Sequence, residues 1–213
     1  MHTARIKVCG ITNLDDALYA IDCGVDALGF VFYSKSPRFI DIPKAKQIIS
    51  QLPPFVSCCG LFVNAKQQDI QAGIDANISL IQFHGDETAT ECDQFDFPYI
   101  RAIRAKDSDT LIHVQNAYPN ARGLLIDSYS PTLYGGSGKT FDWSTIPNDM
   151  RQKIILAGGL TADNVHLAIE MIKPYAVDVS GGVESQKGIK CRQKVKAFCN
   201  AVRSINITSD IND

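Results

Sequence analysis

The chain has 213 residues, enough for one domain with a sizeable core. Its 21 basic and 23 acidic side chains nearly balance, which offers no general attraction to nucleic acid or to an anionic membrane. No apolar run is long enough to span a bilayer, and the first residues lack the apolar stretch of a secretory signal. We therefore expect a cytoplasmic protein whose seven cysteines are free thiols, with no metal site, because its cysteines and four histidines are scattered.

The first structured segment sets the pattern for the rest of the chain. Residues 5–9 alternate polar and apolar side chains, which predicts a short strand that ends at Gly10. Thr12 or Asn13 can cap a helix that follows. The apolar face of this helix comprises Leu14, Ala17, Leu18 and Ile21. Cys9 is thus the last side chain of a strand, and it is either a packing residue or a reactive thiolate.

The same unit of strand followed by helix recurs along the chain. Strands are expected at 5–9, 25–32, 55–63, 78–83, 99–104, 123–126, 154–157 and 176–179. Eight alternating units without a dinucleotide fingerprint favour an α/β fold of the single-domain (β/α)8 TIM barrel type over a doubly wound open sheet. We expect the barrel to span residues 1–206 and a polar C-terminal tail to span residues 207–213.

Three predictions concern the ends and faces of individual helices. A short sixth helix is expected near residues 143–150, and Thr161 is expected to cap the seventh helix. In the last helix, Cys191 and Cys199 share the apolar side and are expected in the core.

A barrel brings the residues that follow its strands to one face, where ligands bind. Here those residues are Cys9, Arg38, His84, Asp127, Gly158, Gly159, Ser180, Gly181 and Gly182. The loops after strands seven and eight commonly bind phosphate in this fold, through backbone N–H groups and a helix N-terminus. The two glycine turns at 158–159 and 180–182 therefore predict a phosphate site, the alternative being simple tight turns.

A glycine-rich loop follows the sixth strand. It resembles a phosphate loop, but Leu133 stands where that motif needs glycine. The loop is better interpreted as a lid over the site, formed by Gly136, Ser137, Gly138 and Lys139. The ammonium of Lys139 either touches the substrate or is solvated.

Three further side chains each have a chemical and a structural interpretation. Arg38 either clamps a carboxylate or is an ordinary surface arginine. Asp127 either titrates in catalysis or caps a turn. His84 either faces the substrate or is a satisfied histidine. Cys9 and Asp127 come from distant strands, so they can approach a small phosphorylated substrate from opposite sides as a base and an acid.

Six strings of the sequence carry a resemblance to a known family. They are KVCGITN (7–13), GFVFYSKSPRFI (29–40), QFHG (82–85), LLIDSYSPTLYGGSGKTFDW (124–143), LAGGLTADNV (156–165) and AVDVSGGVE (176–184). In this order and spacing, which span nearly the whole chain, they resemble phosphoribosylanthranilate isomerases of tryptophan biosynthesis.

The resemblance implies an Amadori rearrangement of N-(5-phosphoribosyl)anthranilate. Asp127 would then be the general acid and Cys9 the general base. Arg38 would bind the anthranilate carboxylate, the two glycine turns would bind the phosphate, and His84 and Asp178 would also contact the substrate. No metal or organic cofactor is implied, and we expect a monomer rather than a homodimer.

The proposed roles make demands on two pKa values. The pKa of Cys9 should be lowered, with Lys7, Arg38 or the first helix terminus as the cause. The pKa of Asp127 should be raised by burial or by nearby negative charge.

Two rival functions remain open at this stage. Among other phosphoribosyl barrels, indole-glycerol-phosphate synthase carries an N-terminal extension and catalytic lysines, and the histidine-pathway isomerase has an aspartate where this chain has Cys9. The other rival is a non-catalytic, phosphate-binding barrel with Cys9 as a sensor thiol, which needs a resolving cysteine nearby. Cys9 and Asp127 lining one pocket would favour the isomerase.

Overall fold

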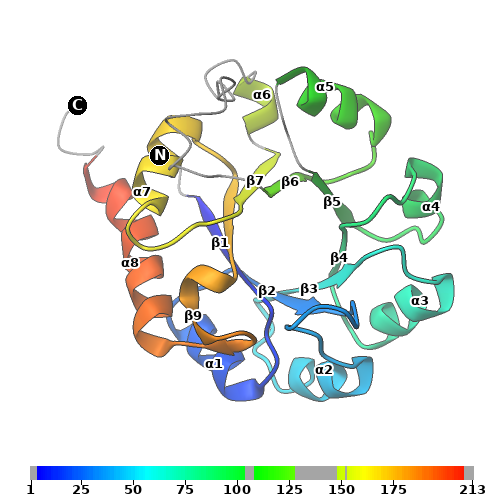
Figure 1. Cartoon of the computed structure of the whole chain (residues 1–213), viewed down its shortest axis with the longest axis horizontal. Helices are drawn as coiled ribbons and strands as arrows, with labels where there is room; N and C mark the ends of the chain where they lie inside the picture. The colour runs from blue at the N-terminus through cyan, green and yellow to red at the C-terminus, as the bar shows by residue number, and fades with distance from the viewer. Residues whose placement is uncertain (1–3, 104–107, 128–147, 152, 209–213) are drawn as a thin grey trace.

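The computed structural model describes residues 4–103, 108–127, 148–151 and 153–208. Eight parallel strands close into a barrel in which each strand pairs with the next and β8 pairs with β1. The helices form a ring around the barrel (Figure 1). The predicted single-domain (β/α)8 TIM barrel is therefore confirmed.

The elements follow the order expected from the sequence. The strands are β1 (Arg5–Cys9), β2 (Ala27–Val31), β3 (Ser57–Phe62), β4 (Leu80–Phe83), β5 (Tyr99–Ile103), β6 (Leu124–Asp127), β7 (Ile154–Ala157) and β8 (Ala176–Val179). The helices are α1 (Leu14–Asp22), α2 (Ile42–Ile49), α3 (Gln67–Asp75), α4 (Ala89–Asp93), α5 (Ser108–Ala117), α6 (Asn148–Arg151), α7 (Val165–Ile172) and α8 (Arg192–Thr208).

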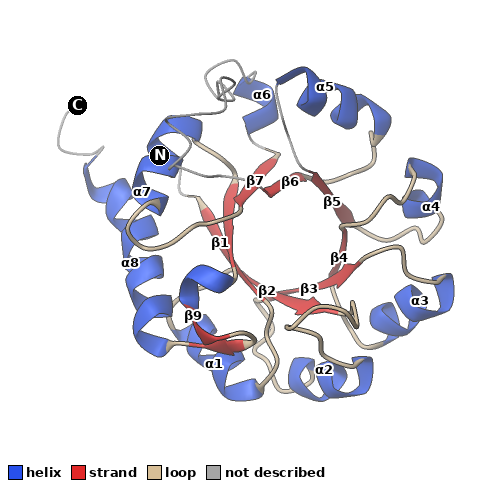
Figure 2. Cartoon of the chain, viewed as in Figure 1, coloured by secondary structure: helices blue, strands red, loops and turns tan. Residues whose placement is uncertain are grey.

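One structured segment after β8 was not expected from the sequence. A 3-10 turn, η2 (Gly181–Val183), is followed by an antiparallel hairpin of β9 (Glu184–Gln186) and β10 (Ile189–Lys190). Figure 2 shows β9 apart from the barrel strands, beside α1. This hairpin connects the last barrel strand to α8.

The alternation of side chains along β1 explains how the barrel is filled. Ile6 and Val8 point outward and belong to the largest apolar cluster, which packs the strands against the helices. The barrel interior is filled mainly by small and branched side chains from other strands, namely Cys59, Ile100, Ala102, Leu125, Ile155, Ala157 and Ala176. Lys7 is also buried, and its Nζ lies 3.0 Å from Oδ1 of Asp178, its register partner on β8. A buried ion pair therefore joins the first and the last strand.

The predicted cap of the first helix is confirmed, but Leu18, expected on the apolar face of that helix, is exposed. Asn13 caps α1, because its side-chain oxygen accepts a hydrogen bond from the backbone N–H of Asp16. The helix ends before Gly24, whose φ of +80° is a conformation that glycine adopts without strain. Asn13 thus fixes the start of α1 after the end of β1, and Gly24 turns the chain back toward β2 at the opposite end of the barrel.

Two local predictions are wrong. Thr161 does not cap α7, because its N–H donates to the side-chain oxygen of Asn164 in a turn that precedes the helix, and Asn164 is the N-cap position. Cys191 lies just before α8 and is half-buried, with its Sγ 3.2 Å from Oε1 of Gln193. Cys199, by contrast, is buried in the core as predicted.

The predicted sixth helix and the predicted C-terminal tail both extend into residues that the structure does not describe. The sixth helix, α6, lies at Asn148–Arg151, and residues 143–147 lie outside the described part of the chain. The last helix continues past residue 206 to Thr208, and residues 209–213 are likewise not described.

Candidate active site

The carboxyl ends of the barrel strands surround one cavity of about 670 Å³. All of the predicted site residues that the structure describes line it. They are Cys9, Arg38, His84, Asp127, Gly158, Gly159, Asp178, Ser180, Gly181 and Gly182. The predicted lid residues Gly136, Ser137, Gly138 and Lys139 lie outside the described residues.

Cys9 lies on the cavity wall at the end of β1. Its register partner on β2 is Gly29, and a Cβ atom on Gly29 would lie only 2.7 Å from Sγ of Cys9. The carbonyl oxygen of Cys9 accepts hydrogen bonds from the Ser180 hydroxyl at 3.0 Å and from Lys190 Nζ at 2.6 Å. Because Gly29 has no side chain, the Cys9 thiol fits closely against β2. The backbone carbonyl of Cys9 is held by Ser180 and Lys190.

The predicted lowering of the pKa of Cys9 is wrong. Burial raises the pKa of this thiol, and the nearby ammonium groups of Lys7 and Lys190 lower it only in part, while Asp178 raises it further. Lys7 remains a cation: burial lowers its pKa, but the Asp178 carboxylate and the cysteines beside it raise the pKa above its ordinary value. The sequence pattern pointed to Lys7 but not to Lys190, and the depth of the strand end could not be known from sequence.

Asp127 lies at the end of β6, next to His84. His84 Nε2 is 3.4 Å from Oδ2 of Asp127, and His84 Nδ1 is 3.1 Å from the amide nitrogen of Gln82. The amide of Gln82 and the carboxylate of Asp127 thus contact the two nitrogens of one imidazole ring, which orients His84 in the cavity wall.

Arg38 lies in the loop between β2 and α2, and its side chain is held by Glu184. The Nε and Nη2 groups donate to the two oxygens of Glu184, both at 2.7 Å, in a forked ion pair. The Nη1 donors are not part of this pair. The Arg38 stem passes over Gly10, where a Cβ would lie 2.6 Å from Cδ of Arg38. Arg38 is thus part of the cavity wall and is not an ordinary surface arginine.

The two glycine turns meet at one side of the cavity. Gly158 and Gly159 have φ values of +85° and +68°, in the region that favours glycine. A Cβ on Gly182 would collide with the carbonyl oxygen of Leu160, so the two turns are in close contact. The turn after β7 also leads toward the N-terminus of α7, the end of a helix that favours an anion.

Sequence reasoning missed four polar residues of this region. Gln82, Glu184 and Lys190 received no role, and Lys7 was considered only for its charge and not as the buried partner of Asp178. Lys7 and Gln82 each stand two residues before a predicted site residue, so the period of two along a strand placed them on the same face. Nothing comparable marks Glu184 and Lys190, which lie on the unexpected hairpin.

Within the described residues, no group of histidine, cysteine and carboxylate side chains is arranged to hold a metal ion. No helix in the same part of the chain is long and apolar enough to cross a membrane.

A closed barrel whose strand ends present a thiol, a carboxylate, a guanidinium and two glycine turns to one cavity defines the class of (β/α)8-barrel enzymes. A family model described as N-(5'-phosphoribosyl)anthranilate (PRA) isomerase matches residues 6–201. The chain belongs to this family and is therefore an isomerase of tryptophan biosynthesis.

Individual relatives agree with the family match. An N-(5'-phosphoribosyl)anthranilate isomerase of Pseudomonas fluorescens (strain Pf0-1) is 52% identical over 95% of this chain and 100% of that protein. The crystal structure of the phosphoribosyl anthranilate isomerase of Thermotoga maritima is 38% identical, with a TM-score of 0.82 over 94% of this chain and 99% of that one. Another similar structure, at 35% identity, a TM-score of 0.81 and the same coverage, is such an isomerase in complex with reduced 1-(o-carboxyphenylamino)-1-deoxyribulose 5-phosphate.

Proposed function

We propose that this chain converts N-(5-phosphoribosyl)anthranilate to 1-(2-carboxyphenylamino)-1-deoxyribulose 5-phosphate, with Asp127 as the general acid and Cys9 as the general base. The observation that carries this assignment is that both side chains line the same cavity, from strands β6 and β1, together with Arg38 and the two glycine turns. The isomerase relatives support the substrate, since one of them is seen with a reduced form of this product.

The reaction needs one proton given and one proton taken. Asp127 donates a proton to the ribose ring oxygen, the bond from that oxygen to C1 breaks, and the substrate nitrogen stabilises C1 as a protonated imine. The Cys9 thiolate then removes the proton on C2, and the electron pair forms the C1–C2 double bond of an enolamine. The enolamine gains a proton at C1 and loses the proton of its C2 hydroxyl, which gives the ketone. Each acid–base group is typically worth about 10²–10⁴-fold in rate.

The raised pKa of Cys9 gives the proposal a specific pH dependence. Only a small fraction of a thiol whose pKa lies above 9.0 is ionised near neutral pH. A thiolate with a raised pKa is a stronger base, so it removes the C2 proton faster once it is ionised. This faster proton transfer offsets the smaller fraction of Cys9 that is ionised. Lys7 and Lys190 oppose the effect of burial and are the groups that keep this fraction from falling further.

The remaining cavity residues bind and orient the substrate in this proposal. Arg38 binds the anthranilate carboxylate, which is the only negative group on the aromatic end of the substrate. The glycine turns at 158–159 and 180–182 bind the phosphate through backbone N–H groups. His84 and Asp178 face the substrate between these ends, and the loop with Gly136, Ser137, Gly138 and Lys139 closes over it.

The first test is turnover of freshly prepared N-(5-phosphoribosyl)anthranilate, followed by the change in its fluorescence. We expect the wild type to be active and Cys9→Ser and Asp127→Asn each to lose about 10²-fold or more in kcat. Activity that survives in Cys9→Ser would move the base to another residue. A folded wild type with no turnover would refute the proposal and leave a barrel that only binds phosphate.

Two further properties belong to the same proposal. The chain acts in the cytoplasm, and it acts as a monomer. The large exposed apolar side chains come from several separate elements, among them Leu18 on α1, Ile112 on α5 and Leu167 on α7, which supports a monomer over one extended apolar interface. A related isomerase of Thermotoga maritima is described as dimeric, so light scattering of this 23.3 kDa chain is the direct test.

A further inference from the structure

A buried carboxylate and a buried ammonium lie behind the cavity wall, between Arg38 and Cys9. Glu184 on β9 is 7% exposed and Lys190 on β10 is 5% exposed. Their side chains contact each other, with Lys190 Nζ 3.1 Å from Oε1 of Glu184. Buried ionised groups of this kind are costly unless each is fully paired, so their contacts indicate what they stabilise.

On one side, Glu184 fixes the orientation of Arg38. Its two oxygens each accept one hydrogen bond from the Nε–Nη2 edge of the guanidinium. A planar guanidinium held along one edge can rotate very little, so the direction of its other donors is set. Burial raises the pKa of Glu184, but the hydrogen bonds from Arg38 and Lys190 outweigh this and lower the pKa to about 2. Glu184 is therefore a permanent anion that holds Arg38.

On the other side, Lys190 holds the end of β1. Its Nζ donates to the carbonyl oxygen of Cys9 at 2.6 Å and lies 3.5 Å from that of Ser180. The same ammonium donates to Glu184. One cation thus connects the residue with the thiol, the start of the second glycine turn and the carboxylate that holds Arg38.

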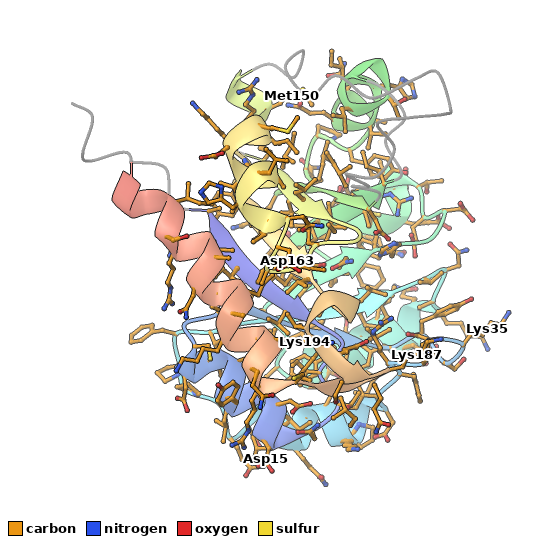
Figure 3. All side chains as sticks on the ribbon, turned by 60° about the vertical axis from the view of Figure 1, so that its left-hand side comes forward. Asp15, Lys35, Met150, Asp163, Lys187 and Lys194 are labelled. Carbon is orange, nitrogen blue, oxygen red and sulfur yellow. The ribbon has the colours of Figure 1, made fainter. Side chains whose placement is uncertain are left out.

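The hairpin that carries this pair is itself tied to the strand ends. The backbone N–H of Gly188, at its turn, donates to Glu184, and the Gly188 carbonyl accepts from the Thr12 hydroxyl. A Cβ atom on Gly188 would lie 3.3 Å from the carbonyl oxygen of Pro37, the residue before Arg38. Figure 3 shows the neighbouring Lys187 on the same side of the molecule as Lys35, which belongs to the loop of Arg38. The pair is therefore built on a frame that touches both β1 and the Arg38 loop.

We propose that Glu184 is a positioning residue that aims Arg38 at the substrate carboxylate, and that Lys190 sets the position of Glu184 relative to Cys9. The inference rests on the proposed function, because it requires a carboxylate on Arg38. Neither Glu184 nor Lys190 lines the cavity, so both act through another residue. The Glu184–Lys190 pair thereby fixes the distance between Arg38, which binds the substrate carboxylate in this proposal, and Cys9, the base.

The test compares two ligands that differ only in the carboxylate. They are the reduced, stable product analogues made from anthranilate and from aniline, and their dissociation constants are measured by calorimetry. For Glu184→Gln we expect the affinity for the carboxylated analogue to fall about ten- to hundredfold, because Arg38 loses its charged, two-point partner. The affinity for the aniline analogue should stay within about twofold.

The controls separate positioning from general damage. Glu87→Gln removes another buried carboxylate, paired with Arg101 at 3.0 Å outside the cavity lining, and should change neither affinity. Glu184→Asp keeps the charge and should restore part of the loss. In the double variant Glu184→Gln/Arg38→Met, the affinity should equal that of Arg38→Met alone, because Glu184 acts only through Arg38.

The outcomes distinguish this inference from the proposed function. Equal losses for both analogues in folded Glu184→Gln, or no loss for either, would overturn the positioning role. A loss confined to the carboxylated analogue, with KM raised and kcat within about threefold, would support it. Wild type that binds neither analogue would refute the proposed function itself. If Glu184→Gln does not fold, Glu184→Asp carries the same comparison between the two analogues.

Discussion

Replacing Gly29 by alanine should impair catalysis by Cys9 while leaving Cys9 itself unsubstituted. Gly29 lies on β2 directly across from Cys9, and its carbonyl accepts hydrogen bonds from the N–H groups of Gly10 and Ile11. A Cβ atom at this position would lie 2.7 Å from Sγ, 3.0 Å from Cα and 3.1 Å from Cβ of Cys9. The substitution therefore pushes on the whole residue, at the point where the chain turns from β1 toward α1.

The size of the effect follows from these distances. Non-bonded carbon atoms settle at about 3.5–4.0 Å, so the thiol must retreat by about 1 Å. A displacement of this size at a reacting group typically costs about 10²-fold in rate. The overpacking itself should lower the free energy of unfolding by about 1–3 kcal/mol, and Tm by about 2–4 °C for each kcal/mol. KM should change little, because the three atoms nearest to the new methyl group all belong to Cys9.

The assay pairs this variant with a matched one on the neighbouring strand. In Gly60→Ala the new Cβ would lie 2.8 Å from Cδ1 of Ile78, on the face of β3 that packs against the helices. Both variants should melt at lower temperature, but only Gly29→Ala should lose kcat. A folded Gly29→Ala that keeps kcat within about threefold of wild type would refute the argument that the position of Cys9 sets the rate.

Three other predictions concern charge and capping. Alkylation of Cys9 by iodoacetamide should be slow at pH 7, and its rate should keep rising with pH past 9.0, the ordinary pKa of a thiol. Lys7→Met should shift the pH profile further upward, and Cys9→Ser serves as the blank. An inflection below about pH 8.5 would contradict the raised pKa. The pKa of Glu184 falls from 4.5 to about 2 on folding, so the stability that this carboxylate adds is present above pH 4.5 and is lost as the pH falls toward 2. The loss of unfolding free energy caused by Glu184→Gln, measured in urea, should therefore shrink between pH 4.5 and 2. A difference from wild type that stays constant over this window would contradict the lowered pKa. Asn13→Ala should cost about 1 kcal/mol of unfolding free energy, and a change in kcat would show that α1 also affects Cys9.

The barrel and the ends of its strands could be predicted because each strand is short, apolar and closed by a polar or glycine residue. Cys9, His84 and Asp127 each stand within one residue of a strand end, which is enough to place them on one face once the fold is a barrel. This inference needs only the order of the strands, and it does not require knowledge of any side-chain contact.

The remaining features depend on contacts between residues far apart in the chain. The pKa of Cys9 depends on how deeply the strand end is buried, and this depth comes from packing by several strands. The hairpin of β9 and β10 is too short to show a period, so its pattern assigned no role to Glu184 or Lys190. Thr161 and Asn164 are both good caps, and only the turn between them decides which one precedes α7.

Two contacts of the site join residues from the two ends of the chain, namely Lys7 with Asp178 and Lys190 with Cys9. They therefore also determine when the site can form during synthesis. The base leaves the ribosome with the first strand, but Lys190, which holds its carbonyl, follows 181 residues later. Domains fold as units, and contacts this distant in sequence form late. A nascent chain that has exposed every strand up to β7 still lacks the second glycine turn, the hairpin and the partner of Lys7. We therefore expect no activity from a chain that ends before β8 and the hairpin.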